Sequence, residues 1–126
     1  MNMTKVVLLL LIASLVLVGC GKRKSYTEMT TAELEHKLAK GEPIVLVDVR
    51  EEAEYREQRI PQATLVPLTQ IKDVYQQLEQ DAEIVLICRS GNRSSTAAAF
   101  LVAKGYTNVA NVVGGMLEWT GPVETG

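Results

Sequence analysis

The chain places one cysteine where a reactive thiolate is expected. Cys88 follows an apolar run, residues 84–87, and precedes a polar segment, residues 89–94, that contains two arginines and a glycine. An alanine-rich, helix-like stretch follows from Ser95 to Lys104. This order predicts a strand, a loop and a helix N-terminus. The unpaired N–H groups and partial positive charge of a helix N-terminus favour an anion, either a thiolate or a bound oxyanion. Thiols so placed have pKa values of about 3.5–7.5, which indicates a reactive thiolate near neutral pH.

A core cysteine is the alternative, because free cysteine is among the most buried side chains. A core position does not need a polar segment with two arginines directly after it. Gly91 and Asn92 tolerate positive φ, which lets successive N–H groups turn inward to form an anion-binding concavity. We therefore predict that Cys88 is a nucleophile at the base of this segment.

The other residues of the segment offer contacts to an anionic substrate. Arg89 and Arg93 are candidates for steering and orienting a donor anion through charge-assisted hydrogen bonds. A solvated loop charge or an ion pair at the helix start is the alternative for each arginine. Ser94 has a hydroxyl that either caps the helix or donates to the anion. The predicted substrate-binding set is Arg89, Ser90, Gly91, Asn92, Arg93 and Ser94.

The chemistry predicted for this site is nucleophilic catalysis in two half-reactions. The Cys88 thiolate attacks the outer sulfur of an anionic donor such as thiosulfate and expels sulfite. The loop N–H groups stabilise the resulting persulfide anion, and a thiol or cyanide then collects the sulfur. This chemistry requires no metal or organic cofactor, and the only histidine, His36, cannot supply a typical zinc site.

The N-terminal segment predicts where the chain acts. Residues 6–18 are almost continuously apolar, and a block of about 13 residues is well short of the ~20 that a transmembrane helix needs. It leads into Leu17-Val18-Gly19-Cys20, which resembles the bacterial lipobox, whose cysteine is acylated and becomes the new N-terminus. We expect residues 1–19 to be a lipoprotein signal peptide, Cys20 the lipidation site and residues 20–26 a linker. An uncleaved membrane anchor is the alternative. Either way, the folded part is expected outside the cytoplasm, tethered to a bacterial membrane.

The remaining length and charge bound the function. Removing 19 of the 126 residues leaves 107, the size of one small domain. That part carries 12 Lys and Arg against 15 Asp and Glu, a mild acidity that predicts no nucleic-acid binding. The chain has two cysteines, so lipid on Cys20 leaves Cys88 without an intramolecular disulfide partner. An unpaired thiol outside the cytoplasm favours a functional role.

Strand-like and helix-like segments alternate over residues 27–126. Thr30 and Glu33 predict a capped helix that stops at Gly41. Asp48 and Arg50 are expected to brace the structure, with Arg50 paired to Glu54 four residues on. The alternation predicts a parallel sheet covered on both faces, with ligands at the carboxyl ends of its strands, where Cys88 lies. Further strands are predicted over residues 44–49, 64–66, 83–87 and 109–113, and further helices over residues 51–58, 68–80, 95–104 and 116–119.

Several short motifs in one order resemble the landmarks of rhodanese-type sulfurtransferases. They are Asp48-Val49-Arg50, Glu54-Tyr55, Ile60-Pro61-Gln62-Ala63, Cys88 to Ser94, and Gly114-Gly115-Met116 with Trp119. The resemblance spans nearly all of residues 27–126. It implies a single rhodanese domain with an open five-stranded parallel sheet, which transfers a sulfane sulfur through a persulfide on Cys88. The chain departs from the family where Gln58-Arg59 and Gln62 replace the usual Gly-His and Gly around the Ile-Pro pair.

Two other classes compete with this interpretation. Cysteine phosphatases and arsenate reductases place the phosphate-binding arginine six positions after the cysteine, whereas here that position is Ser94 and Arg93 comes one residue earlier. The shorter loop fits a sulfur atom better than a tetrahedral oxyanion. A non-catalytic module that holds a sulfur compound or a partner protein in the same pocket is the second alternative.

Overall fold

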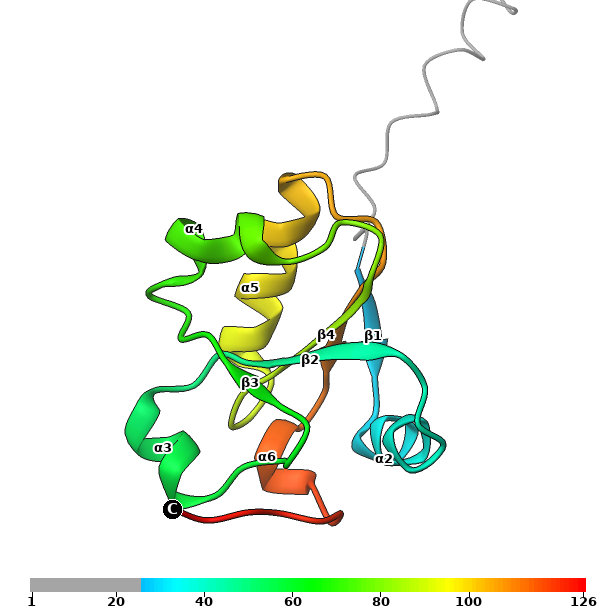
Figure 1. Ribbon diagram of the computed structural model, residues 1–126, viewed down its shortest axis with the longest axis vertical. Helices are drawn as coiled ribbons and strands as arrows, with labels where there is room; N and C mark the ends of the chain where they lie inside the picture. The colour runs from blue at the N-terminus through cyan, green and yellow to red at the C-terminus, as the bar shows by residue number, and fades with distance from the viewer. Residues whose placement is uncertain (1–25) are drawn as a thin grey trace, which may run out of the picture.

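Five parallel strands form one open sheet in the computed structural model, which describes residues 26–126 (Figure 1). Their order across the sheet is β1-β5-β4-β2-β3, which confirms the predicted α/β class. The four strands predicted from the residue pattern are present within two residues of their expected bounds. The strands are β1 (Thr27–Met29), β2 (Ile44–Asp48), β3 (Thr64–Leu65), β4 (Glu83–Ile87) and β5 (Val109–Val112).

The fifth strand, β1, gave no signal of its own in the residue pattern. Its three residues are too few to establish a period, and pairing with β5 defines it, with Thr27 opposite Ala110 and Met29 opposite Val112. Strand β1 therefore depends on tertiary contact.

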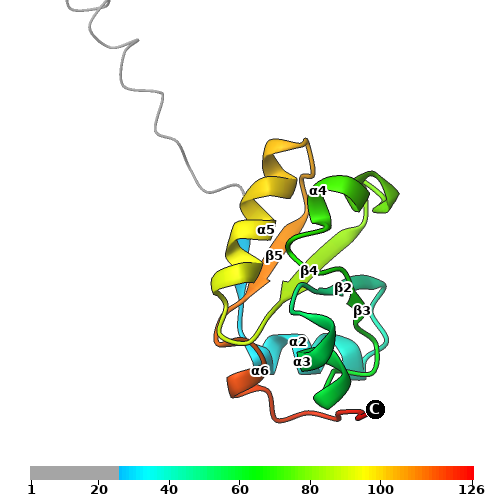
Figure 2. The ribbon, with the colours of Figure 1, turned by 90° about the vertical axis from the view of Figure 1, so that its left-hand side faces the viewer.

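Helices cover both faces of the sheet (Figures 1 and 2). One hydrophobic core lies between the sheet and α4 and α5, and a second lies between the sheet and α2, α3 and α6. Thr30 caps α2 as predicted, because its hydroxyl accepts a hydrogen bond from the Glu33 N–H at 3.1 Å. The helices are α2 (Thr31–Ala39), α3 (Glu52–Glu57), α4 (Ile71–Val74), the 3₁₀ helix η2 (Tyr75–Gln77), α5 (Asn92–Ala103) and α6 (Gly115–Glu118).

Two predicted helices differ from the structure. The helix expected over residues 68–80 is broken into α4 and η2, because the backbone departs from helical φ at Val74 and the chain continues with tighter i→i+3 bonding. The helix expected from Ser95 begins at Asn92 instead. Gly91, at φ 105°, supplies the left-handed turn that lets the helix start three residues earlier.

The alternation of side chains along β4 decides which face the cysteine takes. Ile84 and Leu86 pack against α5, and Val85 and Ile87 pack in the opposite core with α2. Cys88 continues the alternation and joins the core on the α5 side. Its sulfur therefore faces the helix whose N-terminus follows it in sequence.

The topology creates a crevice between β4 and β2. The chain leaves β2 toward β3 at one edge and leaves β4 toward β5 on the other side, so these neighbouring strands form the topological switch point. Ligands bind beyond the carboxyl ends of strands at such points. Helix α3 follows β2 and the cysteine loop follows β4, so both border this crevice.

Helix α6 holds the cysteine loop by its backbone. The Met116 N–H donates to the Cys88 carbonyl at 2.9 Å, and the Leu117 N–H donates to the Arg89 carbonyl at 3.0 Å. This approach requires glycine at Gly115, since a Cβ built there would lie 2.4 Å from the Cys88 oxygen and 2.6 Å from the Arg89 oxygen. The predicted final helix thus docks the cysteine loop.

Residues 1–25 lie outside the described part of the chain, and with them the predicted signal peptide and the lipidation site at Cys20. Within residues 26–126, no helix combines the length and apolar character needed to cross a bilayer.

Replacing Gly115 with alanine is expected to lower the free energy of unfolding because backbone atoms must move to admit the methyl group. We expect a cost of about 1–3 kcal/mol from overpacking, in addition to about 1–2 kcal/mol for a left-handed residue with a Cβ. Chemical denaturation of both proteins measures the difference.

Gly41→Ala is the matched control, because Gly41 has a similar φ of 67° but open space around its Cβ position. Gly41→Ala is expected to show the backbone cost alone. Equal losses in the two variants would contradict the docking role assigned to Gly115.

Candidate active site

The thiol of Cys88 lies at the focus of the loop that follows it. The Gly91 N–H donates to Sγ at an N···S distance of 3.1 Å, and the Ser94 N–H donates at 3.4 Å. The Ser94 Oγ lies 3.2 Å from the same sulfur. Residue Cys88 is 1% exposed, so the sulfur is buried, but the nearby amides point toward it. This arrangement solvates a thiolate with protein dipoles in place of water.

The balance of these contacts lowers the pKa of the thiol. Burial acts to raise the pKa of Cys88, but hydrogen bonds from the Ser94 hydroxyl and from the N–H groups of Ser94, Gly91 and Ser90 outweigh it. The pKa consequently lies below the ordinary value of 9.0. The site thus stabilises the nucleophilic form of the cysteine.

Peptide geometry explains why the Ser90 N–H takes part. The Arg89 carbonyl is bonded to α6, and in a trans peptide the N–H of the next residue points the opposite way. The Ser90 N–H is therefore directed away from α6 and into the loop. The peptide group between Arg89 and Ser90 is therefore bonded on both sides: its carbonyl accepts from α6, and its N–H donates to the Cys88 thiol.

Five of the six residues predicted to bind substrate separate into two groups, and Arg93 stands apart. Ser94 is buried and Gly91 is half-buried, and both contact the sulfur. Arg89, Ser90 and Asn92 have exposed side chains around the opening of the loop. Their role in substrate binding stays a prediction.

Arg93 makes the ion pair at the helix start that the sequence allowed as its alternative role. Its two terminal nitrogens donate to the two carboxylate oxygens of Glu54 at 2.6 and 2.8 Å. The hydrogen bonds from Arg93 chiefly lower the pKa of Glu54 from 4.5 to about 2, with help from the Glu51 N–H and against the effect of burial. The pair links α3 to the first turn of α5, beside the cysteine.

The expected pairing of Arg50 with the Glu54 carboxylate is wrong. Arg50 instead forms a buried pair with Asp48, with Nε and Nη2 donating at 3.0 and 2.7 Å. Nη1 donates to the backbone carbonyl of Glu54, and Nη2 also donates to that of Gln58. The predicted bracing role is thus carried by a different partner: Arg50 fixes the C-terminal end of α3 to the end of β2.

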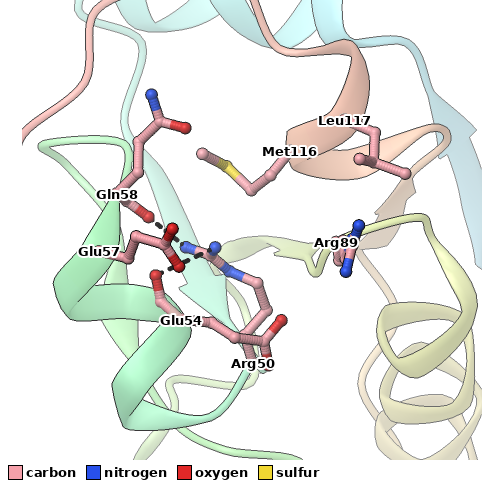
Figure 3. Close-up of a pocket in the computed structure, with 7 residues that line it drawn as sticks. All are labelled: Arg50, Glu54, Glu57, Gln58, Arg89, Met116 and Leu117. Atoms are coloured by element: carbon pink, nitrogen blue, oxygen red, sulfur yellow. Dashed lines mark hydrogen bonds between the residues drawn. The ribbon is translucent and has the colours of Figure 1, made fainter.

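A pocket of about 330 Å³ opens between α3, the loop and α6 (Figure 3). It lies at the switch point of the sheet. Figure 3 places the α3 residues on one wall, Arg89 on the facing wall, and Met116 and Leu117 above them. The lining residues are Arg50, Glu54, Glu57, Gln58, Arg89, Met116 and Leu117. Within residues 26–126, no group of three His, Cys, Asp or Glu side chains is placed to hold a metal ion.

Sequence reasoning missed two contributors to the site. The sequence pattern pairs the Glu54 carboxylate with Arg50, four residues away. In the structure the carboxylate contacts Arg93, which lies 39 positions away in sequence. The amides of Met116 and Leu117 were not assigned any role at the loop. The glycine pair before them was the available signal, because a double glycine marks a close backbone approach.

Comparison with known proteins matches this arrangement to one family. The Rhodanese-like domain family matches residues 30–122. YtwF of Bacillus subtilis is 42% identical over 94 residues, covering 75% of this chain and 90% of its own length. A protein of Allochromatium vinosum named a sulfurtransferase is 37% identical over 92 residues, covering 73% of this chain and 86% of its own length.

Solved structures agree with the sequence comparison. The crystal structure of a rhodanese-like domain protein from Staphylococcus aureus superposes with a TM-score of 0.73 at 33% identity. The match covers 79% of this chain and 98% of that protein. Since the family matches residues 30–122 and relatives of 37–42% identity are covered over most of their length, the chain belongs to the rhodanese-like domain family.

Proposed function

We propose that the protein is a sulfurtransferase that moves a sulfane sulfur from an anionic donor such as thiosulfate to a thiol or cyanide through a persulfide on Cys88. The observation that carries the proposal is the convergence of the Gly91 and Ser94 donors on Sγ. The name of the Allochromatium relative supports the same activity.

In the first half-reaction the Cys88 thiolate attacks the outer sulfur of thiosulfate. A bond forms between Sγ and that sulfur, the sulfur–sulfur bond of thiosulfate breaks, and its electron pair leaves with sulfite. The persulfide anion carries its charge within the loop, where the donors are already oriented. In the second half-reaction the acceptor attacks the outer sulfur and returns the electron pair to Sγ.

Arg89 is proposed to orient the donor anion. Its side chain is exposed, lines the pocket and directly follows the nucleophile in sequence. Arg93 is proposed to act at longer range, because both its terminal nitrogens are bonded to Glu54 and its charge still interacts with Cys88.

The phosphatase alternative lacks the arginine that its chemistry requires. Cysteine phosphatases place the phosphate-binding arginine six positions after the cysteine, and here the nearest arginine to that place, Arg93, lies one residue earlier and is paired with Glu54. The residue six positions after Cys88 is a serine whose hydroxyl faces the sulfur.

We further propose that the full chain is anchored by lipid on Cys20 and acts outside the cytoplasm. The support is the short apolar block before Leu17-Val18-Gly19-Cys20 in the sequence.

Incubation of the purified protein with thiosulfate is expected to add one sulfur atom to Cys88, and subsequent cyanide is expected to remove it as thiocyanate. Intact-mass measurement follows the loading, and a colorimetric assay follows thiocyanate. Cys88→Ser is expected to abolish both. Loading without release would favour the non-catalytic carrier role, and a fully active Cys88→Ser protein would exclude the nucleophile assignment.

The thiol is expected to react with iodoacetamide along a pH profile whose midpoint lies below 9.0, because the folded site lowers the pKa of Cys88. In Ser94→Ala the thiolate loses its hydroxyl donor, so the midpoint moves up. A hydrogen bond to a charged group is worth about 1.5–3 kcal/mol, which predicts alkylation slower by roughly ten- to a hundredfold at pH 7. Ser95→Ala is the control, since its hydroxyl bonds only the Asn92 carbonyl. Equal midpoints in the two variants would be evidence against the role of Ser94.

Expression of the full chain in a bacterium grown with labelled fatty acid is expected to label the protein, and Cys20→Ser is expected to remove the label. On fractionation, the wild-type protein is expected with the membrane and the Cys20→Ser protein in a soluble fraction. An unlabelled wild-type protein would refute the lipid anchor while leaving the sulfurtransferase proposal intact.

A further inference from the structure

Two opposite charges in the pocket are left unpaired by the rest of residues 26–126. Arg50 is occupied by Asp48, and Glu54 is occupied by Arg93. The side chains of Glu57 and Arg89 make no hydrogen bond or ion pair within residues 26–126, and both are exposed. The pocket therefore offers one free anion and one free cation to a ligand.

These two charges belong to facing walls. Glu57 comes from α3 and Arg89 from the loop across the pocket (Figure 3). Between them and above lie the side chains of Met116 and Leu117, and Leu117 is 63% exposed, an unusual exposure for a large apolar residue. A ligand that suits this surface carries a cationic end, an anionic end and a short apolar or sulfur-containing part.

The size of the pocket favours a small molecule. Its volume of about 330 Å³ lies at the lower end of the ~300–1,000 Å³ typical of ligand sites. The cysteine loop contributes Arg89 to the wall, so a ligand held there lies beside the loop that surrounds the Cys88 sulfur.

Building on the function proposed above, we propose that this pocket is the acceptor subsite for a small thiol with both an ammonium and a carboxylate group, of which cysteine is the simplest. The ammonium pairs with Glu57, the carboxylate pairs with Arg89, and the methylene rests against Leu117. Arg89 is available for this second task because sulfite has left before the acceptor enters.

The transfer step balances without any further reactant. The acceptor thiol passes its proton to the outer sulfur of the Cys88 persulfide anion, and the resulting thiolate attacks that sulfur. A sulfur–sulfur bond forms to the acceptor, and the bond to Sγ breaks. The electron pair returns to Sγ as a thiolate held by Gly91 and Ser94, and the proton stays on the transferred sulfur. The products are the resting enzyme and the persulfide of the small thiol.

The test compares transfer from the sulfur-loaded full-length protein to four thiols at 0.15 M salt. Cysteine carries both charges, cysteamine only the ammonium, 3-mercaptopropionate only the carboxylate, and 2-mercaptoethanol neither. Rates are expressed per thiolate, and the rate for cysteine is expected to be the highest. Loading is first measured by intact mass.

The two pocket variants are expected to shift the cysteamine-to-mercaptopropionate rate ratio in opposite directions. Exposed ion pairs contribute about 0.2–1 kcal/mol, so Glu57→Gln is expected to lower the cysteamine-to-mercaptopropionate rate ratio by up to about fivefold. Arg89→Gln is expected to raise it by a similar factor. Taking the ratio in each variant cancels the intrinsic nucleophilicity of the thiols.

Glu52→Gln is the matched control, because Glu52 lies on α3, is exposed and does not line the pocket. Its ratio is expected to equal that of the wild type. An unchanged ratio in Glu57→Gln, or an equal change in Glu52→Gln, would overturn the acceptor subsite alone. Failure of Cys88 to load sulfur would overturn both this proposal and the sulfurtransferase proposal.

Discussion

The site depends on the backbone of residues 88–90 being held from outside. The carbonyl groups of Cys88 and Arg89 accept hydrogen bonds from the Met116 and Leu117 amides of α6, and the Ser90 N–H, on the other side of the Arg89 peptide, turns into the loop as a result. Burial of a thiolate raises the free energy of the folded state unless hydrogen-bond donors surround the charge. The glycine at residue 115 is what allows α6 to approach, so a residue 27 positions from the nucleophile controls its environment.

Most of the charged side chains around the loop are paired within the chain. Two arginines near the pocket, Arg50 and Arg93, are bonded to carboxylates of the same chain and fix α3 against β2 and α5. They serve as structural anchors more than as receptors for substrate. This leaves Glu57 and Arg89 as the charged side chains of the pocket that make no ion pair within residues 26–126.

The residue pattern predicted most of the fold because its signals were local. Strand β4 is an uninterrupted apolar run, and the α2 cap is set by Thr30 and the residues just after it. The predictions were wrong where contacts between segments distant in sequence determine the structure. Strand β1 needs β5, and Glu54 pairs with Arg93 across 39 positions. Two other differences are local. The helix over residues 68–80 breaks where Val74 departs from helical φ. Helix α5 begins at Asn92 because Gly91 adopts a left-handed turn at the closing of the loop.

The sequence by itself determined the place of Cys88 at the end of a strand and its local polar surroundings. Period-two alternation in β4 fixes the face that Cys88 takes, and the polar residues after it can place amides near its sulfur. Only the tertiary structure decided which arginine is free, which carboxylate each of the others meets and how the loop is docked. The physical reason is that alternation and capping act between neighbours in the chain, whereas the pairing of charges depends on which strands lie side by side at the switch point of the sheet.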